Sequence, residues 1–334
     1  MINVAVLGCG YWGANLLRNF AENQSFQLVA CADTDASRFE RLAWRYPAVR
    51  MSTDACQILH DDAIDAVAIA TPANTHYSLA CEALRCGKHI LIEKPLATSA
   101  AEAIELVELA CHNHLTLMVD HTFVYTGAVR KIREIIENNE LGEIHYFDSV
   151  RINLGLFRHD VNVLWDLVPH DLSIMDFILP RRPVAVSASG GAHITPGVLD
   201  MAYVTVHFDD ATLAHFHCNW LAPVKVRTII IGGSKRLVLY DDSEPSEKVK
   251  IYDRGIDGPN SNHVYTKLVQ YRLGNMYAPY LDTREALNVA CAHFAECITT
   301  GQEPITGGEA GLAVVRILEA AERSINEHSR QVPL

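Results

Sequence analysis

The sequence lacks the patterns that mark several classes of protein. Its nine cysteines form no Cys-x-x-Cys pair and its sixteen histidines form no His-Glu-x-x-His motif, so no metal site is indicated. It contains no stretch of about 18 uninterrupted apolar residues, which argues against a transmembrane helix, and it begins without a basic signal segment. We therefore expect a cytoplasmic protein whose cysteines are reduced and buried.

Positive charge is also scarce. The 28 lysine and arginine residues are outnumbered by 40 aspartate and glutamate residues, which gives a net charge of −12. This balance argues against nucleic acid or an anionic membrane as a partner, although a few local cations could still bind an anionic small molecule. With 334 residues, 49% of them hydrophobic, the chain is long enough for two folded domains.

The first 120 residues alternate short apolar runs with longer helical patterns. The apolar runs are nearly continuous, as expected of strands covered on both faces: residues 2–7, 27–32, 66–70, 89–92 and 116–119. Helical patterns lie between and after them, at residues 12–22, 35–46, 54–60, 75–86 and 99–113. This repetition predicts a Rossmann domain, a doubly wound parallel sheet, over residues 1–121.

The pattern changes after residue 121. A helix is predicted near 128–138, followed by strands in which apolar and polar residues alternate, at 203–208, 212–220, 228–231 and 236–240. Two closing helices are predicted to start at Asp282 and Thr306, each with a capping-box pattern. We predict an α/β domain over residues 122–334 with a large open, mostly antiparallel sheet. Because an exposed apolar sheet face needs cover, we expect a homodimer or homotetramer formed through it.

A glycine-rich turn follows the first strand. Gly8, Gly10 and Gly13 form G-x-G-x-x-G around Tyr11 and Trp12, and Asp33 follows 20 residues after Gly13. This context predicts a dinucleotide site, with the pyrophosphate at the helix N-terminus and Asp33 on the adenosine ribose. The alternative is a tight turn without a ligand. An acid at position 33 favours NAD over NADP, although Arg38 could reach a phosphate.

Two further strand ends are predicted to reach the same edge of the sheet. Thr71, Pro72, Asn74 and His76 follow the fourth strand, as cofactor contacts or as a plain capped loop.

The fifth strand ends at Glu93-Lys94-Pro95, and His121 follows the sixth strand. We predict that Glu93, Lys94 and His121 contact the cofactor. Burial and a cationic nicotinamide would lower the pKa of Lys94 and suit it for proton transfer. The alternative is a surface lysine at the end of a strand. The Lys94–Pro95 bond is a candidate for cis geometry.

Asp166 and His170 form a candidate acid–base pair. One helical turn would place both on the same side, where the carboxylate could fix the histidine tautomer. In the plainer alternative Asp166 caps a helix and His170 is only a polar residue.

With these residues in view, the sequence resembles the Gfo/Idh/MocA family of oxidoreductases over essentially its whole length. The motifs that carry the resemblance are GCGYWG (8–13), TPANTH (71–76), GKHILIEKPLA (87–97) and WDLVPHD (165–171). The resemblance implies that Lys94 is the catalytic lysine and that Asp166 and His170 face the substrate. As a hypothesis, His170 exchanges the hydroxyl proton while Lys94 polarises the oxygen; the reverse assignment stays open.

The substrate class is inferred from the same resemblance. The motifs are similar to a branch associated with polysaccharide and sugar-nucleotide biosynthesis, which includes UDP-N-acetylglucosaminuronate 3-dehydrogenases. This implies NAD-dependent oxidation of a ring hydroxyl, at C3, of a nucleotide sugar. The polar residues expected to contact it are Arg151, Arg158, Asn162, Asp166, His170, Lys225 and Arg227, although the later cations could be ordinary strand-surface charge.

Three other functions stay open at this point. One is an inositol or other free-polyol dehydrogenase, which would share the Lys/Asp/His set. The second is a nucleotide-sugar 3-ketoreductase, although such members often carry tyrosine in place of His170. The third is a dinucleotide-binding regulator without turnover, against which the intact Lys94, Asp166 and His170 argue.

Overall fold

The computed structural model describes residues 1–155, 161–257 and 270–334. It divides into two compact units. The first comprises residues 1–125 and 284–319, and the second comprises residues 126–283 and 320–334. The return of residues 284–319 to the first unit was not among the predictions.

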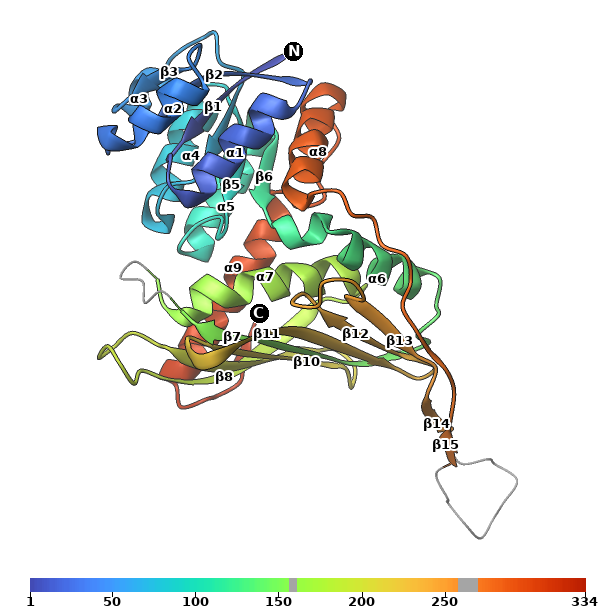
Figure 1. Cartoon of the computed structure of the whole chain (residues 1–334). Coiled ribbons are helices and arrows are strands. Elements are labelled where there is room, and N and C mark those ends of the chain that lie inside the picture. The colour runs from blue at the N-terminus through green and yellow to red at the C-terminus, as the bar shows by residue number, and fades with distance from the viewer. Residues whose placement is uncertain (156–160, 258–269) are drawn as a thin grey trace. The chain divides into compact units, whose positions relative to one another are not determined.

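The first unit is built on a parallel sheet (Figure 1). Its six strands lie in the order β3-β2-β1-β4-β5-β6, so the order reverses between β1 and β4, as in dinucleotide-binding folds. The predicted doubly wound sheet is therefore confirmed. The prediction lacked β3, which has only three residues. The strands are β1 (Ile2–Leu7), β2 (Phe26–Ala32), β3 (Arg50–Ser52), β4 (Ala66–Ile69), β5 (His89–Glu93) and β6 (Leu117–Asp120).

Helices follow the strands of this sheet. The Ser99 hydroxyl accepts a hydrogen bond from the Glu102 amide at 3.2 Å, so the capping pattern at the start of α5 is present. The helices are α1 (Tyr11–Glu22), α2 (Phe39–Arg45), α3 (Ala55–Leu59), α4 (His76–Arg85), α5 (Ala100–His112), α8 (Ala286–Thr300) and the first part of α9 (Gly308–Asn326), with 3-10 turns η1 (Ala36–Arg38), η2 (Ala73–Thr75) and η3 (Thr122–Tyr125).

Side-chain contacts hold residues 284–319 in the first unit. The Arg18 guanidinium on α1 donates two hydrogen bonds, of 2.5 and 2.9 Å, to the Glu285 carboxylate. The Thr306 hydroxyl donates to the Val119 carbonyl at 2.7 Å. These contacts also correct two predictions, because Glu285 rather than Asp282 precedes α8 and Thr306 bonds to β6 instead of serving the predicted capping box.

The second unit contains a large mixed sheet (Figure 1). Within the described residues it has nine strands in the order β16-β13-β12-β11-β7-β10-β9-β8-β17, all antiparallel pairs except β7 with β10. The predicted open, mostly antiparallel sheet is confirmed. The strands are β7 (Ile144–Leu154), β8 (Pro183–Gly191), β9 (Met201–Phe208), β10 (Leu213–Asn219), β11 (Leu221–Gly233), β12 (Leu237–Asp241), β13 (Val249–Tyr252), β16 (Met276–Tyr277) and β17 (Val332–Pro333), with β14 (Gly255–Asp257) and β15 (Gln270–Arg272) forming a separate pair.

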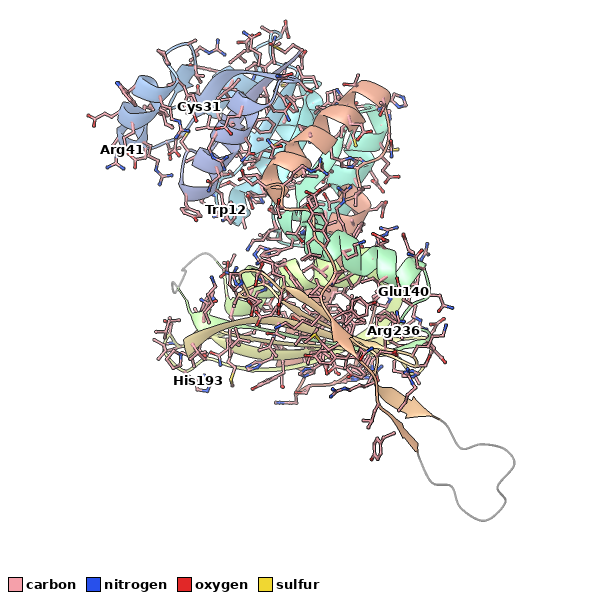
Figure 2. The ribbon with its side chains drawn as sticks, turned by 45° about the vertical axis from the view of Figure 1, so that its right-hand side comes forward. Trp12, Cys31, Arg41, Glu140, His193 and Arg236 are labelled. Atoms are coloured by element: carbon pink, nitrogen blue, oxygen red, sulfur yellow. The ribbon has the colours of Figure 1, made fainter. Side chains whose placement is uncertain are left out.

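Helices cover one face of this sheet. Helix α7 (Val163–Ile178) packs on β7, β9 and β10, and α6 (Gly127–Glu137) packs on α7. Side chains on β10 alternate accordingly: Ala214, Phe216 and Cys218 are buried, whereas Leu213 is exposed. Among residues 126–155, 161–257, 270–283 and 320–334, no helix covers the opposite face of the sheet (Figure 1). An ion pair of 2.8 Å between Glu140, after α6, and Arg236, before β12, braces one end of the unit (Figure 2).

The composition led us to expect buried, reduced cysteines and no transmembrane helix. All nine cysteines are unbonded thiols, and six are buried as predicted. Cys56 and Cys111 are exposed and Cys86 is half-buried, so the expectation of burial was wrong for these three. Among the helices that the structure describes, none is both long and apolar enough to cross a membrane.

Candidate active site

The glycine-rich turn joins β1 to α1. Gly8 has a φ of 90°, in the region that favours glycine, and a side chain on Gly13 would overlap the Gly8 carbonyl oxygen. Gly10 is the N-cap of α1 and has no side chain to cap the first amides. Backbone N–H groups at the positive end of the helix are thus left for a phosphate. Tyr11 is exposed and Trp12 is nearly half exposed at the start of the same helix (Figure 2).

Asp33 directly follows β2, and its side chain holds the glycine-rich turn in place. One carboxylate oxygen accepts from the Cys9 amide at 2.6 Å and from the Arg38 guanidinium at 3.0 Å; the other accepts from the Asp35 amide at 2.9 Å. The Asp33 side chain is only 7% exposed. The acid predicted to bind the ribose therefore also holds the loop and orients Arg38.

A cavity of about 460 Å³ opens beside these residues. It lies where the strand order reverses, the usual place for a nucleotide in such sheets. An adenosine-sized opening beside uncapped helix amides and a buried acid fits NAD. The lining includes Gly8, Asp33, Arg38, Thr53, Thr71 and Leu79.

The loop after β4 is tied to the loop after β5. The two ring nitrogens of His76 lie 2.8 Å from the Pro95 carbonyl oxygen and 3.0 Å from that of Thr71. His76 is buried, so its first role is to join the two loops. Pro72 and Asn74 are exposed in this loop, and Thr71 and Pro72 line the cavity.

Lys94 directly follows β5 and is half-buried. The predicted cis bond to Pro95 is present. Glu93 and Asp120 are register partners at the ends of β5 and β6, and both carboxyls are buried. Burial raises the pKa of both, and the charge of Asp120 raises that of Glu93 further. The two buried carboxyls at these paired strand ends therefore oppose each other's ionisation.

His121 follows Asp120 and is 1% exposed. Neither ring nitrogen has a hydrogen-bond partner among the residues that the structure describes. Burial, and then the charge of Lys94, lower the pKa of His121 to about 3. The ring is therefore neutral at physiological pH and retains both a donor and an acceptor for a ligand.

In the second unit, helix α7 positions Asp166 and His170. Within residues 163–170 these two are the side chains that are not buried, one turn apart as the spacing predicted. Asp166 does not cap the helix; Asn162 does, since its side-chain oxygen accepts from the Leu164 and Trp165 amides. Asp166 accepts from the Trp220 indole at 3.2 Å.

The residues predicted to bind the substrate differ in how they are engaged. Arg151 is buried in a two-bond ion pair with Asp171, at 2.6 and 2.9 Å, and Arg227 bonds to Asp242 at 3.3 Å. Asn162 caps α7 and donates to Glu322 at 2.9 Å. Lys225 is exposed on β11, and Arg158 lies outside the described residues.

Comparison with known proteins identifies the family. A model described as an oxidoreductase family with an NAD-binding Rossmann fold matches residues 2–121, and a model of the GFO/IDH/MocA C-terminal domain matches residues 129–238. The chain belongs to the Gfo/Idh/MocA oxidoreductase family. Membership confirms the resemblance seen in the sequence, and the predicted NAD cofactor with it.

Two relatives of this Gfo/Idh/MocA member carry names that point to different kinds of substrate. UDP-N-acetylglucosamine 3-dehydrogenase of Acidithiobacillus ferrooxidans is 28% identical over 256 residues, 76% of this chain and 78% of that protein. A solved structure of the same enzyme has a TM-score of 0.82 at 25% identity, covering 98% of this chain and 99% of that one. Inositol 2-dehydrogenase of Rhizobium meliloti is 24% identical and covers 100% of this chain and 99% of that protein.

Sequence reasoning missed Asp120. A signal was available, because Glu93 and Asp120 are both acids at the carboxyl ends of neighbouring parallel strands, and such ends meet at one edge of the sheet. The spacing of cysteines and histidines along the sequence likewise gave no sign that His60, Glu82 and Cys86 come together.

Proposed function

We propose that this Gfo/Idh/MocA oxidoreductase oxidises a ring hydroxyl, at C3, of a nucleotide sugar and passes the hydride to NAD. The carbon that bears the hydroxyl loses a hydride, the hydroxyl loses a proton, and a carbonyl forms. The similarity in sequence and in fold to a UDP-N-acetylglucosamine 3-dehydrogenase carries this proposal.

The first unit supplies the cofactor half of the reaction. When bound, NAD accepts the hydride. Gly8, Gly10 and Gly13 would hold its phosphates against α1, Asp33 its ribose, and the ends of β5 and β6 its reactive part. Lys94 and Glu93 attract each other when both are charged, since the charge of Lys94 lowers the pKa of the buried Glu93 carboxyl. A cationic Lys94 would polarise the substrate oxygen.

His170 then takes the hydroxyl proton, and Asp166 orients it and stabilises the resulting imidazolium. Asp166 is itself oriented by the Trp220 indole. The two roles can be separated by comparing Lys94→Met and His170→Asn in single-turnover hydride transfer across pH. If His170 is the base, loss of activity at low pH should persist in Lys94→Met and vanish in His170→Asn.

A free polyol is the second candidate, supported by the inositol 2-dehydrogenase relative and by the engagement of Arg151 and Arg227 with carboxylates. A pyrophosphate would have to be recognised by other groups, such as Lys225. Recognition of the nucleotide part of the substrate therefore needs a separate test.

Binding of UDP separates the two candidates. Titration of UDP into the NAD-loaded protein, followed by calorimetry, should give saturable binding if the substrate is a uridine diphosphate sugar. The same protein should reduce NAD with UDP-N-acetylglucosamine or its uronate and not with myo-inositol. NAD reduction with myo-inositol and no heat from UDP would replace this proposal with the polyol alternative.

A further inference from the structure

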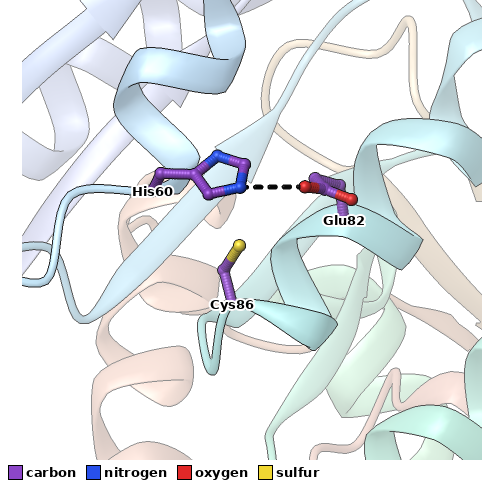
Figure 3. A group of neighbouring side chains, drawn as sticks. All are labelled: His60, Glu82 and Cys86. Atoms are coloured by element: carbon purple, nitrogen blue, oxygen red, sulfur yellow. Dashed lines mark ion pairs between the residues drawn. The ribbon is translucent and has the colours of Figure 1, made fainter.

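Three side chains in the first unit gather in one place (Figure 3). They are not among the residues that line the nucleotide cavity. They are His60, Glu82 and Cys86, and one potential ligand atom from each lies within 4.8 Å of the others. The His60 Nε2 atom is 3.2 Å from a Glu82 carboxylate oxygen. None of the three enters the reaction proposed above.

The fold places these side chains on fixed elements. His60 is the C-cap of α3, whereas Glu82 lies on α4 and Cys86 is its C-cap. Glu82 and Cys86 are four residues apart, so one helical turn brings both to the same side of α4. The group therefore joins the ends of two helices.

The orientation of the His60 ring points to a cation. Its Nδ1 lies 3.0 Å from the Cys56 carbonyl oxygen, which can only accept, so Nδ1 carries the ring proton. In the neutral ring, Nε2 then presents a lone pair to the Glu82 carboxylate, and two acceptors face each other at 3.2 Å. A cation placed between Nε2 and the carboxylate oxygen would take a lone pair from each. Metal-bound histidines usually donate their other ring nitrogen to a carbonyl or carboxylate in the same way.

We propose that His60, Glu82 and Cys86 bind a zinc-type divalent cation. Imidazole, carboxylate and thiolate are the donor types that such cations take, and three protein ligands leave the fourth position to water. Binding would displace the Cys86 thiol proton to solvent, so affinity should rise with pH. The sequence has neither a Cys-x-x-Cys nor a His-Glu-x-x-His pattern because the ligands come from two separate helices.

The location gives the site a structural consequence. Ala55 at the start of α3, and Ser78 and Leu79 in the first half of α4, line the nucleotide cavity. The metal would link the opposite ends of the same two helices. It should therefore act as a clamp on the wall of the cofactor cavity, and stabilise the folded first unit through binding.

Cobalt(II) titration of the metal-free full-length protein tests the site, because a cobalt–thiolate bond gives a near-ultraviolet charge-transfer band. We expect about one equivalent to produce the band in the wild type. Cys86→Ser should abolish it, whereas Cys111→Ser, at an exposed cysteine on α5, should keep it. His60→Gln, at an exposed position, should weaken binding at least tenfold and lower the thermal stabilisation given by zinc.

Two results would overturn the proposal. One is the absence of a thiolate band in the wild type, which would leave His60 and Glu82 as an ordinary ion pair. The other is a band of equal strength in Cys86→Ser, which would place the metal elsewhere. Neither result depends on whether the protein oxidises a nucleotide sugar.

Discussion

At the scale of single residues, Asp33 combines two tasks. It holds the Cys9 amide and the Arg38 guanidinium, and it is the acid proposed to bind the ribose of NAD. Asp33→Ala removes a charged acceptor and releases Arg38, which could then meet the 2′-phosphate of NADP. We expect NAD affinity to fall about 10- to 100-fold, as for loss of a charged hydrogen bond worth about 1.5–3 kcal/mol, and the preference to shift toward NADP.

Asp35 offers a matched control for this change. It also pairs with Arg38, at 3.4 Å, but its side chain is half exposed and does not hold the glycine-rich turn. Asp35→Ala should leave the ratio of NAD to NADP affinity close to that of the wild type. An unchanged ratio in Asp33→Ala, measured by cofactor titration, would contradict the role given to Asp33.

Burial of His121 should make the stability of the folded protein depend on pH. The pKa of His121 is about 3 in the folded chain, against an ordinary 6.5. Below 6.5 the unfolded chain therefore binds a proton that the folded chain does not, so stability is lost as pH falls through this window. Denaturant unfolding at a series of pH values should show a slope up to about 1.4 kcal/mol per pH unit smaller in His121→Gln. Equal slopes would show that the ring is protonated in the folded protein.

Some site residues could be predicted from the sequence and others could not, for a physical reason. Gly8, Gly13 and the Lys94–Pro95 bond were identified because backbone geometry restricts the residue type there. Arg151 could not be placed from sequence, since a lone cation gives no sign that a carboxylate 20 residues away, Asp171, will neutralise it.

At the scale of elements, α7 depends on its cap. Asn162 accepts from two amides at the start of the helix and bonds to Glu322. Asn162→Ala should lower the unfolding free energy by about 1 kcal/mol, the usual effect of losing an N-cap. Asn162→Ser, which can still cap, should recover most of that loss. If instead the alanine variant mainly raises the KM for substrate without a change in stability, Asn162 is a binding residue as first predicted.

The same scale shows where periodicity identifies elements and where it fails. Strands β1, β4 and β5 are continuous apolar runs, and each was predicted within a residue or two. Strand β7 was not predicted, because Ser149 and Arg151 on its buried side interrupt the alternation of apolar and polar residues. The helical pattern of α8 was visible, but its docking on α1 depends on the Arg18–Glu285 pair, which local sequence does not reveal.

At the scale of the whole molecule, the uncovered sheet face predicts self-association. Tyr146 pairs with Leu213 across β7 and β10, and Tyr203 on β9 pairs with His217 two pleats further along the same face. All three apolar side chains are more than a third exposed. We expect a homodimer or homotetramer through this face. Sedimentation should show a smaller species for Leu213→Glu with Tyr203→Glu, and no change for Ile194→Glu, at an exposed loop position. A monomeric wild type would refute the expectation.

The most direct test of the whole account concerns Lys94. We would load the wild type and Lys94→Met with NAD and the nucleotide sugar that passes the substrate test, and follow one turnover by absorbance of the reduced nicotinamide. A group that polarises or deprotonates the reacting hydroxyl contributes about 10²–10⁴-fold, so the rate of hydride transfer should fall by at least about 100-fold. A variant that still binds NAD and transfers hydride at nearly the wild-type rate would contradict the account.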